Sequence, residues 1–113
     1  MELSKIQYID PLEIIDDILK KTYNISLNEI CVKSRKKEIV RMRQIVQTIL
    51  RRHTWWSLAE IGVAVGMRNH ATVINSIKVI EDSEFVYKKT GKKQEVYSIY
   101  KEIESKFIDT MFI

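Results

Sequence analysis

The sequence predicts an all-α fold, a compact bundle of about five to six helices that contains a helix-turn-helix with a basic loop ahead of it. The chain has 113 residues, a length that fits one domain, so we treat 1–113 as a single unit. Hydrophobic residues make up 45% of it, and it contains one proline and three glycines, so few positions interrupt a helix. Apolar side chains recur at helical spacing along most of its length.

The first third of the chain predicts two helices and a loop. The first helix is expected to begin at Pro11, with Asp10 as its N-cap and Asn24 as its end. "SLNEI" predicts a short second helix, because Ser26 and Glu29 have the spacing of a capping box. "CVKSRKK" breaks the helical period, and we expect a basic loop there.

The middle of the chain predicts a long helix followed by a helix-turn-helix. The long helix runs over about 38–52, and its inner stripe consists of Ile39, Met42, Ile45 or Val46, Ile49 and Leu50. Ser57 and Glu60 repeat the capping-box spacing in "SLAEIGVAVG", and Gly66 can adopt the left-handed conformation that ends this short helix. Asn69 is a good N-cap for "HATVINSIKVIED", whose inward residues are Val73, Ile77 and Ile80. Two helices joined by a tight glycine turn are typical of a helix-turn-helix.

The remaining segments are less regular. "KKTGKK" predicts a turn, and a last amphipathic helix is expected over about 94–110, with Val96, Ile99, Tyr100, Ile103 and Phe107 inward. Of the adjacent Trp55 and Trp56, we expect one to be a buried anchor and the other to be partly exposed. The alternative is an exposed tryptophan that rests on a sugar-phosphate edge or on a protein partner.

Charge is distributed unevenly along the chain. Residues 1–32 carry three basic and six acidic groups, whereas residues 33–52 carry eight basic groups against Glu38 alone, a net charge of +7. Such a block inside a foldable chain indicates a surface that binds a polyanion, and the alternative is a solvated basic face.

Signatures of catalysis, cofactors, metals and membranes are missing from the sequence. No glycine-rich phosphate loop occurs, and His53 and His70 are too far apart to suggest a metal site, so we expect no enzyme, no cofactor and no metal. Asp16 and Asp17 fit a solvated helix face. The single Cys31 forms no internal disulfide and fits a buried thiol in a reducing cytoplasm. We find neither a signal peptide nor an apolar run of about 20 residues that could span a membrane.

Residues 43–82, "RQIVQTILRRHTWWSLAEIGVAVGMRNHATVINSIKVIED", resemble the C-terminal DNA-binding domain of DnaA, the bacterial chromosomal replication initiator. The similarity depends on "KSRKKEIVRMRQ" at 33–44, "SLAEIG" at 57–62 and "GMRNHATV" at 66–73, and it is strongest over 26–82. It implies an all-helical module that binds double-stranded DNA at a short asymmetric box, for which a monomer suffices. It also implies a role in replication initiation or its regulation, in the cytoplasm at the nucleoid.

The resemblance assigns DNA-binding roles residue by residue. It implies that Arg35 enters the minor groove, that Arg43 and Gln44 lie near the phosphate backbone, and that the first turn of the helix after Gly66 enters the major groove. Basic and hydroxyl side chains can bind phosphates, arginine can read guanine, and asparagine can read adenine. The candidate DNA-binding residues are Lys33, Arg35, Lys36, Lys37, Arg43, Gln44, Thr54, Ser57, Arg68, Asn69, His70, Ala71, Thr72, Asn75 and Lys78.

The sequence departs from the family pattern at three positions of the reading segment. Met67 replaces a glycine, Asn69 an aspartate and Ala71 a threonine, so base preference is expected to differ from the family's box. The motor domain that precedes this module in the initiator is missing, so the chain is either a stand-alone module or an excised fragment.

Other functions remain open. The main alternative is a protein-interaction module that docks on an initiator or another replication protein and modulates it. At single sites, the basic loop could be merely solvated, His70 could bond a helical neighbour, and Arg68 could pair with Glu81.

Overall fold

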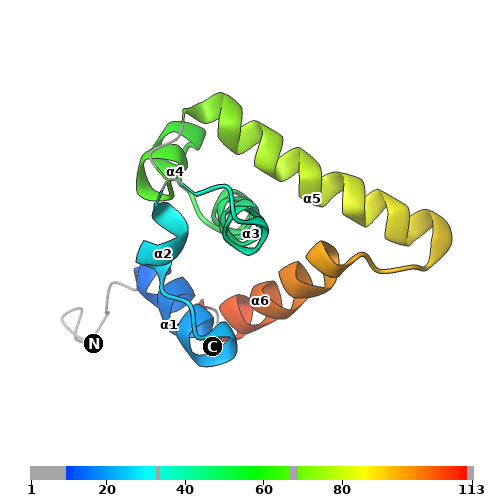
Figure 1. Ribbon diagram of the computed structural model, residues 1–113, viewed down its shortest axis with the longest axis horizontal. Helices are drawn as coiled ribbons and strands as arrows, with labels where there is room; N and C mark the ends of the chain where they lie inside the picture. Colours follow the sequence, from blue (N-terminus) through cyan, green and yellow to red (C-terminus); the bar gives the residue numbers. More distant parts are fainter. Residues whose placement is uncertain (1–9, 33, 67–68, 112–113) are drawn as a thin grey trace, which may run out of the picture.

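The computed structural model describes residues 10–32, 34–66 and 69–111, which form six α-helices (Figure 1). In chain order these are α1 (Pro11–Tyr23), α2 (Leu27–Cys31), α3 (Lys37–His53), α4 (Leu58–Ala64), α5 (His70–Thr90) and α6 (Glu95–Met111). The described residues contain no strand, so the predicted all-α class is confirmed.

The long helix α3 is the centre of the bundle. Figure 1 views it end-on with the other helices around it, and it contacts α2, α4, α5 and α6. Its predicted stripe is buried except for Ile39, which is partly buried, and Ile45 and Val46 are both fully buried, so the apolar face is wider there than the sequence suggested. Each fully buried aliphatic side chain contributes about 1.5–3 kcal/mol, which makes this helix the main source of the core.

The predicted caps form at most helix ends. Asp10 accepts a hydrogen bond from the Leu12 backbone N–H at 2.9 Å, and Asn24 ends α1 in the left-handed region. Ser26 caps α2 by accepting from the Glu29 N–H at 3.2 Å. The capping box at the start of α4 forms in both directions, as detailed at the candidate interface.

Asp16 joins α1 to α2, a structural role that the sequence did not indicate. Its Oδ1 accepts from the backbone N–H of Leu27 at 2.7 Å, which ties α1 to the start of α2. This bond, together with the nearby ammonium of Lys20, lowers the pKa of the Asp16 carboxyl. The expectation of a merely solvated face is therefore wrong for Asp16, whereas Asp17 is exposed and pairs with Lys21.

Helix α5 is longer than its hydrophobic pattern indicated. The pattern fades after residue 82, yet the helix continues to Thr90 and ends at Gly91 with a φ of 73°. Ser76 and Ser83 occupy buried positions on the inner face, where apolar residues would have extended the pattern. Their hydroxyls donate to the backbone carbonyls of Thr72 and Ile80, so these buried polar groups are satisfied within the helix.

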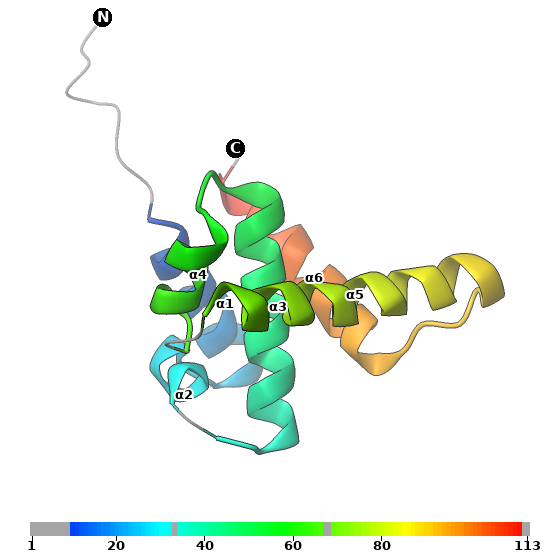
Figure 2. The same ribbon diagram turned by 90° about the horizontal axis from the view of Figure 1, so that it is seen from above.

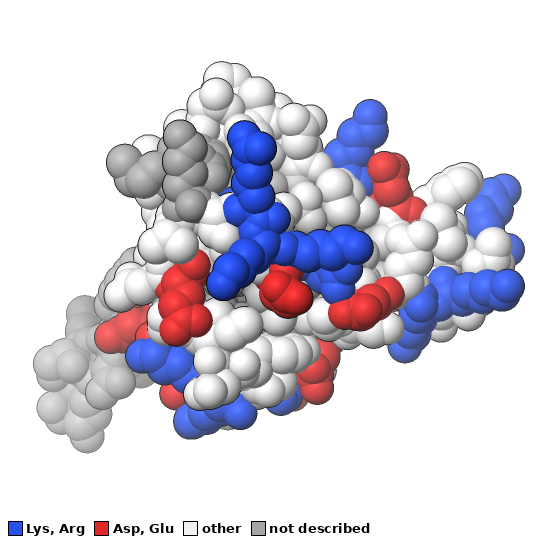
Figure 3. Space-filling view, viewed as in Figure 1, with Lys and Arg blue, Asp and Glu red and all other residues white. Residues whose placement is uncertain are grey.

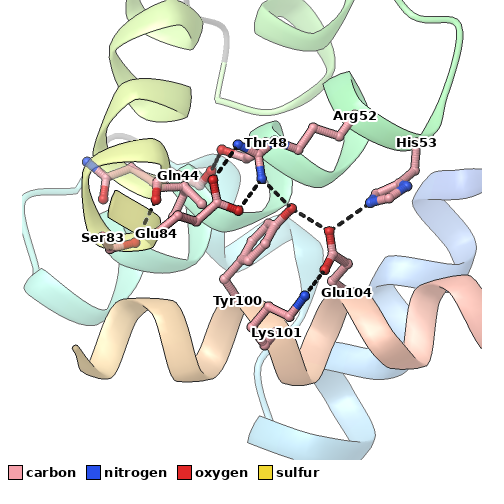
Figure 4. A network of polar contacts seen from close by, with 10 residues as sticks. Gln44, Thr48, Arg52, His53, Ser83, Glu84, Tyr100, Lys101 and Glu104 are labelled. Carbon is pink, nitrogen blue, oxygen red and sulfur yellow. Dashed lines mark hydrogen bonds and ion pairs between the residues drawn. The ribbon is translucent and has the colours of Figure 1, made fainter. Parts of the chain in front are cut away.

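The second half of α5 is held to α3 by an arginine fork (Figure 4). Arg52 donates to both carboxylate oxygens of Glu84, at 2.6 and 2.9 Å, and to the Tyr100 hydroxyl of α6 at 3.1 Å. Because a planar guanidinium matches a carboxylate in two parallel bonds, this pair fixes orientation as well as position.

Helix α6 joins the same network through Glu104. The Tyr100 hydroxyl donates to Glu104 at 2.5 Å, and His53 and Lys101 contact the same carboxylate at 2.8 and 3.0 Å. Burial alone raises the pKa of Glu104, but these three partners outweigh it and hold the pKa below the ordinary value.

The molecule is elongated, with extents of 50 × 31 × 27 Å. Figure 2 shows why, since the end of α5 and the start of α6 project beyond the other helices. In the part of the chain that the structure describes, no helix has the length and apolarity needed to cross a membrane.

Candidate nucleic-acid interface

The predicted basic loop joins α2 to α3. Arg35, Lys36 and Lys37 are exposed, and the Ser34 hydroxyl accepts from the Lys36 N–H at 3.1 Å within the loop. Lys33 lies outside the described residues, so its expected phosphate contact stays a prediction. Figure 3 shows basic side chains gathered over the centre of the face seen in Figure 1.

Arg43 holds the start of this loop in place. Its side chain is buried, its Nε donates to the Ile30 carbonyl at 2.9 Å, and its Nη2 donates to the Val32 carbonyl at 2.7 Å. These carbonyls stand at the C-terminal end of α2, where a positive charge is favourable. These bonds commit the Arg43 guanidinium to positioning the basic loop and disfavour the expected contact with DNA phosphate, which stays a prediction.

Gln47, one turn further along α3, holds the end of α4, where the helix-turn-helix makes its turn. It is fully buried, and its Nε2 donates to the carbonyl of Val65, the residue that ends α4, at 2.8 Å. Its Oε1 is buried and has no hydrogen-bond partner among the described residues. Sequence reasoning missed Gln47, although an amide inside the α3 apolar stripe was the available signal.

The basic loop and the helix-turn-helix are thereby held side by side. Arg43 and Gln47 are four residues apart and so share one face of α3. A third link is the Cys31 thiol, half-buried at the end of α2, which donates to the Ala64 carbonyl at the end of α4 at 3.6 Å. The residues that lead into the loop and those that lead into the turn therefore meet.

The turn begins at Gly66, whose φ of 92° lies in the region that favours glycine, as predicted. Met67 and Arg68 lie outside the described residues, so the guanine contact of Arg68 and its alternative pairing with Glu81 stay predictions. The chain is described again from Asn69, and α5 packs closely on α4.

The first turn of α5 is exposed and polar. Asn69 is its N-cap, as predicted, and Oδ1 accepts from both the backbone N–H and the hydroxyl of Thr72, at 3.0 and 3.2 Å. An amide oxygen has two lone pairs, so both are in use. Reading adenine with both ends of the side chain is therefore disfavoured, and Asn69 keeps its N–H₂ group as a donor. His70 and Ala71 are exposed beside it.

The remaining candidates differ in how accessible they are. Asn75 and Lys78 are exposed on the outer face of α5. Gln44 is half-buried and lines a groove of about 440 Å³ together with Arg35 and Lys37. Ser57 is exposed, and its hydroxyl accepts from the Glu60 N–H at 3.1 Å and also hydrogen-bonds the Glu60 carboxylate.

The residues just before α4 divide into inward and outward groups. The Thr54 hydroxyl donates to the Leu50 carbonyl and accepts from the Trp56 N–H, two bonds that help to end α3, and its expected phosphate contact stays a prediction. Trp56 is half-buried against the core and Trp55 is fully exposed. In the capping box, the Ser57 N–H donates to the Glu60 carboxylate at 2.9 Å, which lowers the pKa of Glu60.

The described residues hold no group of three histidine, cysteine or carboxylate side chains that could bind a metal ion. What they hold is a short capped helix, a glycine turn and a longer helix with a polar first turn. This arrangement defines a helix-turn-helix protein.

Comparison with known proteins identifies the family. Residues 12–80, more than half of the chain, match the family described as the bacterial dnaA protein helix-turn-helix. The chain therefore belongs to this family, as its resemblance to the DnaA C-terminal domain indicated.

Individual relatives point to the same family. The chain is 36% identical over 91 residues to the chromosomal replication initiator protein DnaA of Bacteroides thetaiotaomicron, an alignment that covers 77% of this chain and 19% of that protein. The DnaA of Desulfotalea psychrophila is 42% identical over 69 residues, covering 61% of this chain and 14% of that protein. The chain thus spans about a fifth or less of the length of these relatives. No solved structure matches it.

Proposed function

We propose that the chain binds double-stranded DNA in a sequence-specific, non-catalytic manner, at a short asymmetric site of the DnaA-box type. Its role would lie in replication initiation or its regulation. The proposal rests on one observation: the basic loop lies beside the helix-turn-helix. Arg43 and Gln47 of α3 hold these two segments together. Membership of the DnaA helix-turn-helix family supports the same function.

Each segment has a groove to which its chemistry is suited. An arginine such as Arg35 responds to the negative potential of a narrow minor groove. The first turn of α5 offers an imidazole at His70, a methyl group at Ala71 and an amide donor at Asn69 to base edges in the major groove. The N-terminus of α5 adds the positive end of the helix dipole, which favours approach to the DNA.

Phosphate contacts would supply most of the affinity. Lys36 and Lys37 are exposed beside Arg35, and Ser57 is exposed at the N-terminus of α4. Each phosphate that the protein neutralises makes the logarithm of the binding constant fall by about 0.9 per decade of salt. Binding should therefore weaken steeply as the salt concentration rises.

The alternative is a module that docks on an initiator or another replication protein. An apolar surface on and beside α4 favours it, because Trp55 is fully exposed and Val63 is largely exposed next to a groove of about 430 Å³. The basic loop argues against docking as the main function, since a protein contact centred on α4 does not use Arg35.

A mobility-shift experiment on pooled random duplexes tests the proposal. We expect binding that weakens steeply with salt, enrichment of a motif, and losses of about 5-fold to 150-fold for Arg35→Ala and His70→Ala, by analogy with base contacts worth about 1–3 kcal/mol. Lys21→Ala, an exposed α1 residue that pairs with Asp17 and belongs to neither segment, is the control and should bind like the wild type. Absence of enrichment, with both interface variants unchanged, would refute the proposal.

A further inference from the structure

A second cationic surface lies at the projecting end of the molecule. We call residues 85–94, which close α5 and lead into α6, the lysine tip. This segment contains four lysines and no acidic residue, and all four are exposed, namely Lys88, Lys89, Lys92 and Lys93. Gly91 turns the chain between the two lysine pairs, with a φ of 73° and no atom within 4 Å of the position a Cβ would take.

The carboxylates that flank the tip are already neutralised. Glu84 is bound by Arg52 at 2.6 Å, and Glu95 is bound by Arg41 at 2.6 Å. Among the described residues, none of the four tip lysines forms an ion pair. The positive charge of the tip is therefore uncompensated by its neighbours.

Aromatic rings organise part of this charge. The Lys89 Nζ lies 5.6 Å from the centroid of the Phe85 ring, and the Lys93 Nζ lies 5.5 Å from that of Tyr87. Phe85 is 61% exposed, so its contact with Lys89 lies on the surface, where a ring restrains an ammonium group without removing it from water. Restrained ammonium groups lose less entropy when they bind an anion.

The tip shares a face with the basic loop. The groove of about 440 Å³ is lined both by Arg35 and Lys37 and by Gln94 and Glu95, the residues that follow the tip lysines. Figure 3 shows basic side chains both at the centre of this face and at its right-hand end. One extended polyanion can therefore contact both groups.

The length of α5 sets the reach of the tip. Its 21 residues span about 30 Å from the reading turn to the tip, at about 1.5 Å per residue. Duplex DNA rises about 3.4 Å per base pair, so this distance corresponds to roughly nine base pairs. The family match over residues 12–80 ends before the tip.

We propose that the lysine tip binds backbone phosphates of the duplex that α5 reads, on one flank of the recognition site and without regard to base sequence. This inference rests on the proposed function, because it assumes that the first turn of α5 faces DNA. Duplex DNA is favoured over an anionic membrane surface because Gln94, the last residue of the tip, and Arg35 of the basic loop line one groove. A second reason is that the Lys89 ammonium lies over the exposed ring of Phe85, the apolar group that would otherwise be available to enter a membrane.

The test compares two charge-matched triple variants. The tip variant is K89Q/K92Q/K93Q, and the control is K20Q/K21Q/K106Q, which removes three exposed lysines from α1 and α6. Both lower the net charge by three, and circular dichroism with thermal melting verifies that both are folded. Binding is measured across a salt series on a duplex that carries the selected site with long flanks, and on duplexes trimmed from either side.

We expect the tip variant to lower the magnitude of the salt slope by two to three, at about 0.9 for each lost phosphate contact, while the control keeps the wild-type slope. Trimming about nine base pairs from one flank should weaken wild-type binding and leave the tip variant unchanged. Equal salt slopes for the wild type and the tip variant, with the motif still enriched, would overturn the phosphate contact of the lysine tip and leave the proposed function intact.

Two further outcomes would also overturn the inference. If wild type enriches no motif at all, the proposed function fails and the inference fails with it. If the tip variant binds duplexes like the wild type but loses binding to vesicles of anionic phospholipid, the surface belongs to a membrane contact instead.

Discussion

Arg43→Met is expected to destabilise the protein without changing the salt dependence of DNA binding. Methionine fills most of the buried space but leaves the carbonyls of Ile30 and Val32 without their donor. A hydrogen bond from a charged group contributes about 1.5–3 kcal/mol, and an unpaired buried acceptor incurs its full desolvation cost. Ile30 is 0% exposed and Val32 is 56% exposed, so water can replace the second bond more easily than the first.

These terms together predict a loss of about 2–4 kcal/mol in the free energy of unfolding. For a domain of this size, that corresponds to a fall of about 8–16 °C in melting temperature. Urea denaturation and thermal melting measure both quantities. DNA affinity should also fall, since the basic loop is no longer held, but the salt slope should stay within about 0.3 of the wild type.

Arg43→Lys separates the charge from the geometry of the fork. Lysine keeps the positive charge but cannot donate to both carbonyls in the same way, so the variant should remain clearly less stable than the wild type. The reasoning would be refuted if Arg43→Met melted at the wild-type temperature while its salt slope dropped by about 0.9, and if lysine restored that slope. Arg43 would then be a phosphate contact after all.

Three other sets of substitutions test separate parts of the structure. Asn69→Ala should cost about 1 kcal/mol by removing the cap of α5, whereas Asn69→Asp should keep the stability and shift the selected bases, as measured by melting and by selection from random duplexes. The pKa of Glu104 lies below 4.5, so its ionised network contributes stability that is present above pH 4.5 and lost as the pH falls through the folded-state pKa. Urea titrations of Glu104→Gln should accordingly show a loss of about 1–3 kcal/mol at pH 7 that shrinks at lower pH, and a gap that is independent of pH would contradict this account. Trp55→Ala should change the unfolding free energy by less than about 0.5 kcal/mol because the ring is fully exposed, whereas the half-buried Trp56→Ala should cost about 2 kcal/mol.

Features that depend on neighbours in the sequence could be predicted from it. The caps at Asp10 and Ser57, the left-handed Asn24 and Gly66 and the stripe of α3 all follow from residues within two turns of one another. The helix-turn-helix was predictable for the same reason, because a capping box, a glycine and an N-cap occur in close succession.

Features that depend on tertiary packing could not be predicted. The second half of α5 has buried serines in place of apolar residues, and its position is fixed by Arg52, Glu84 and the α6 residue Tyr100. Arg43 occurs among exposed basic residues, and only the packing of α2 against α3 shows that it is buried. Asp16 likewise gains its role when the N-terminus of α2 meets α1.

Selection of bound sequences from a pool of random duplexes tests the central claim most directly. The wild type is run in parallel with Arg35→Ala, His70→Ala and the control Lys21→Ala. We predict that the wild type and the control enrich the same short asymmetric motif. Arg35→Ala should lose preference at the minor-groove end of the motif, and His70→Ala should lose it at positions in the major groove. The claim is contradicted if the wild type enriches no motif, or if all four proteins enrich the same one.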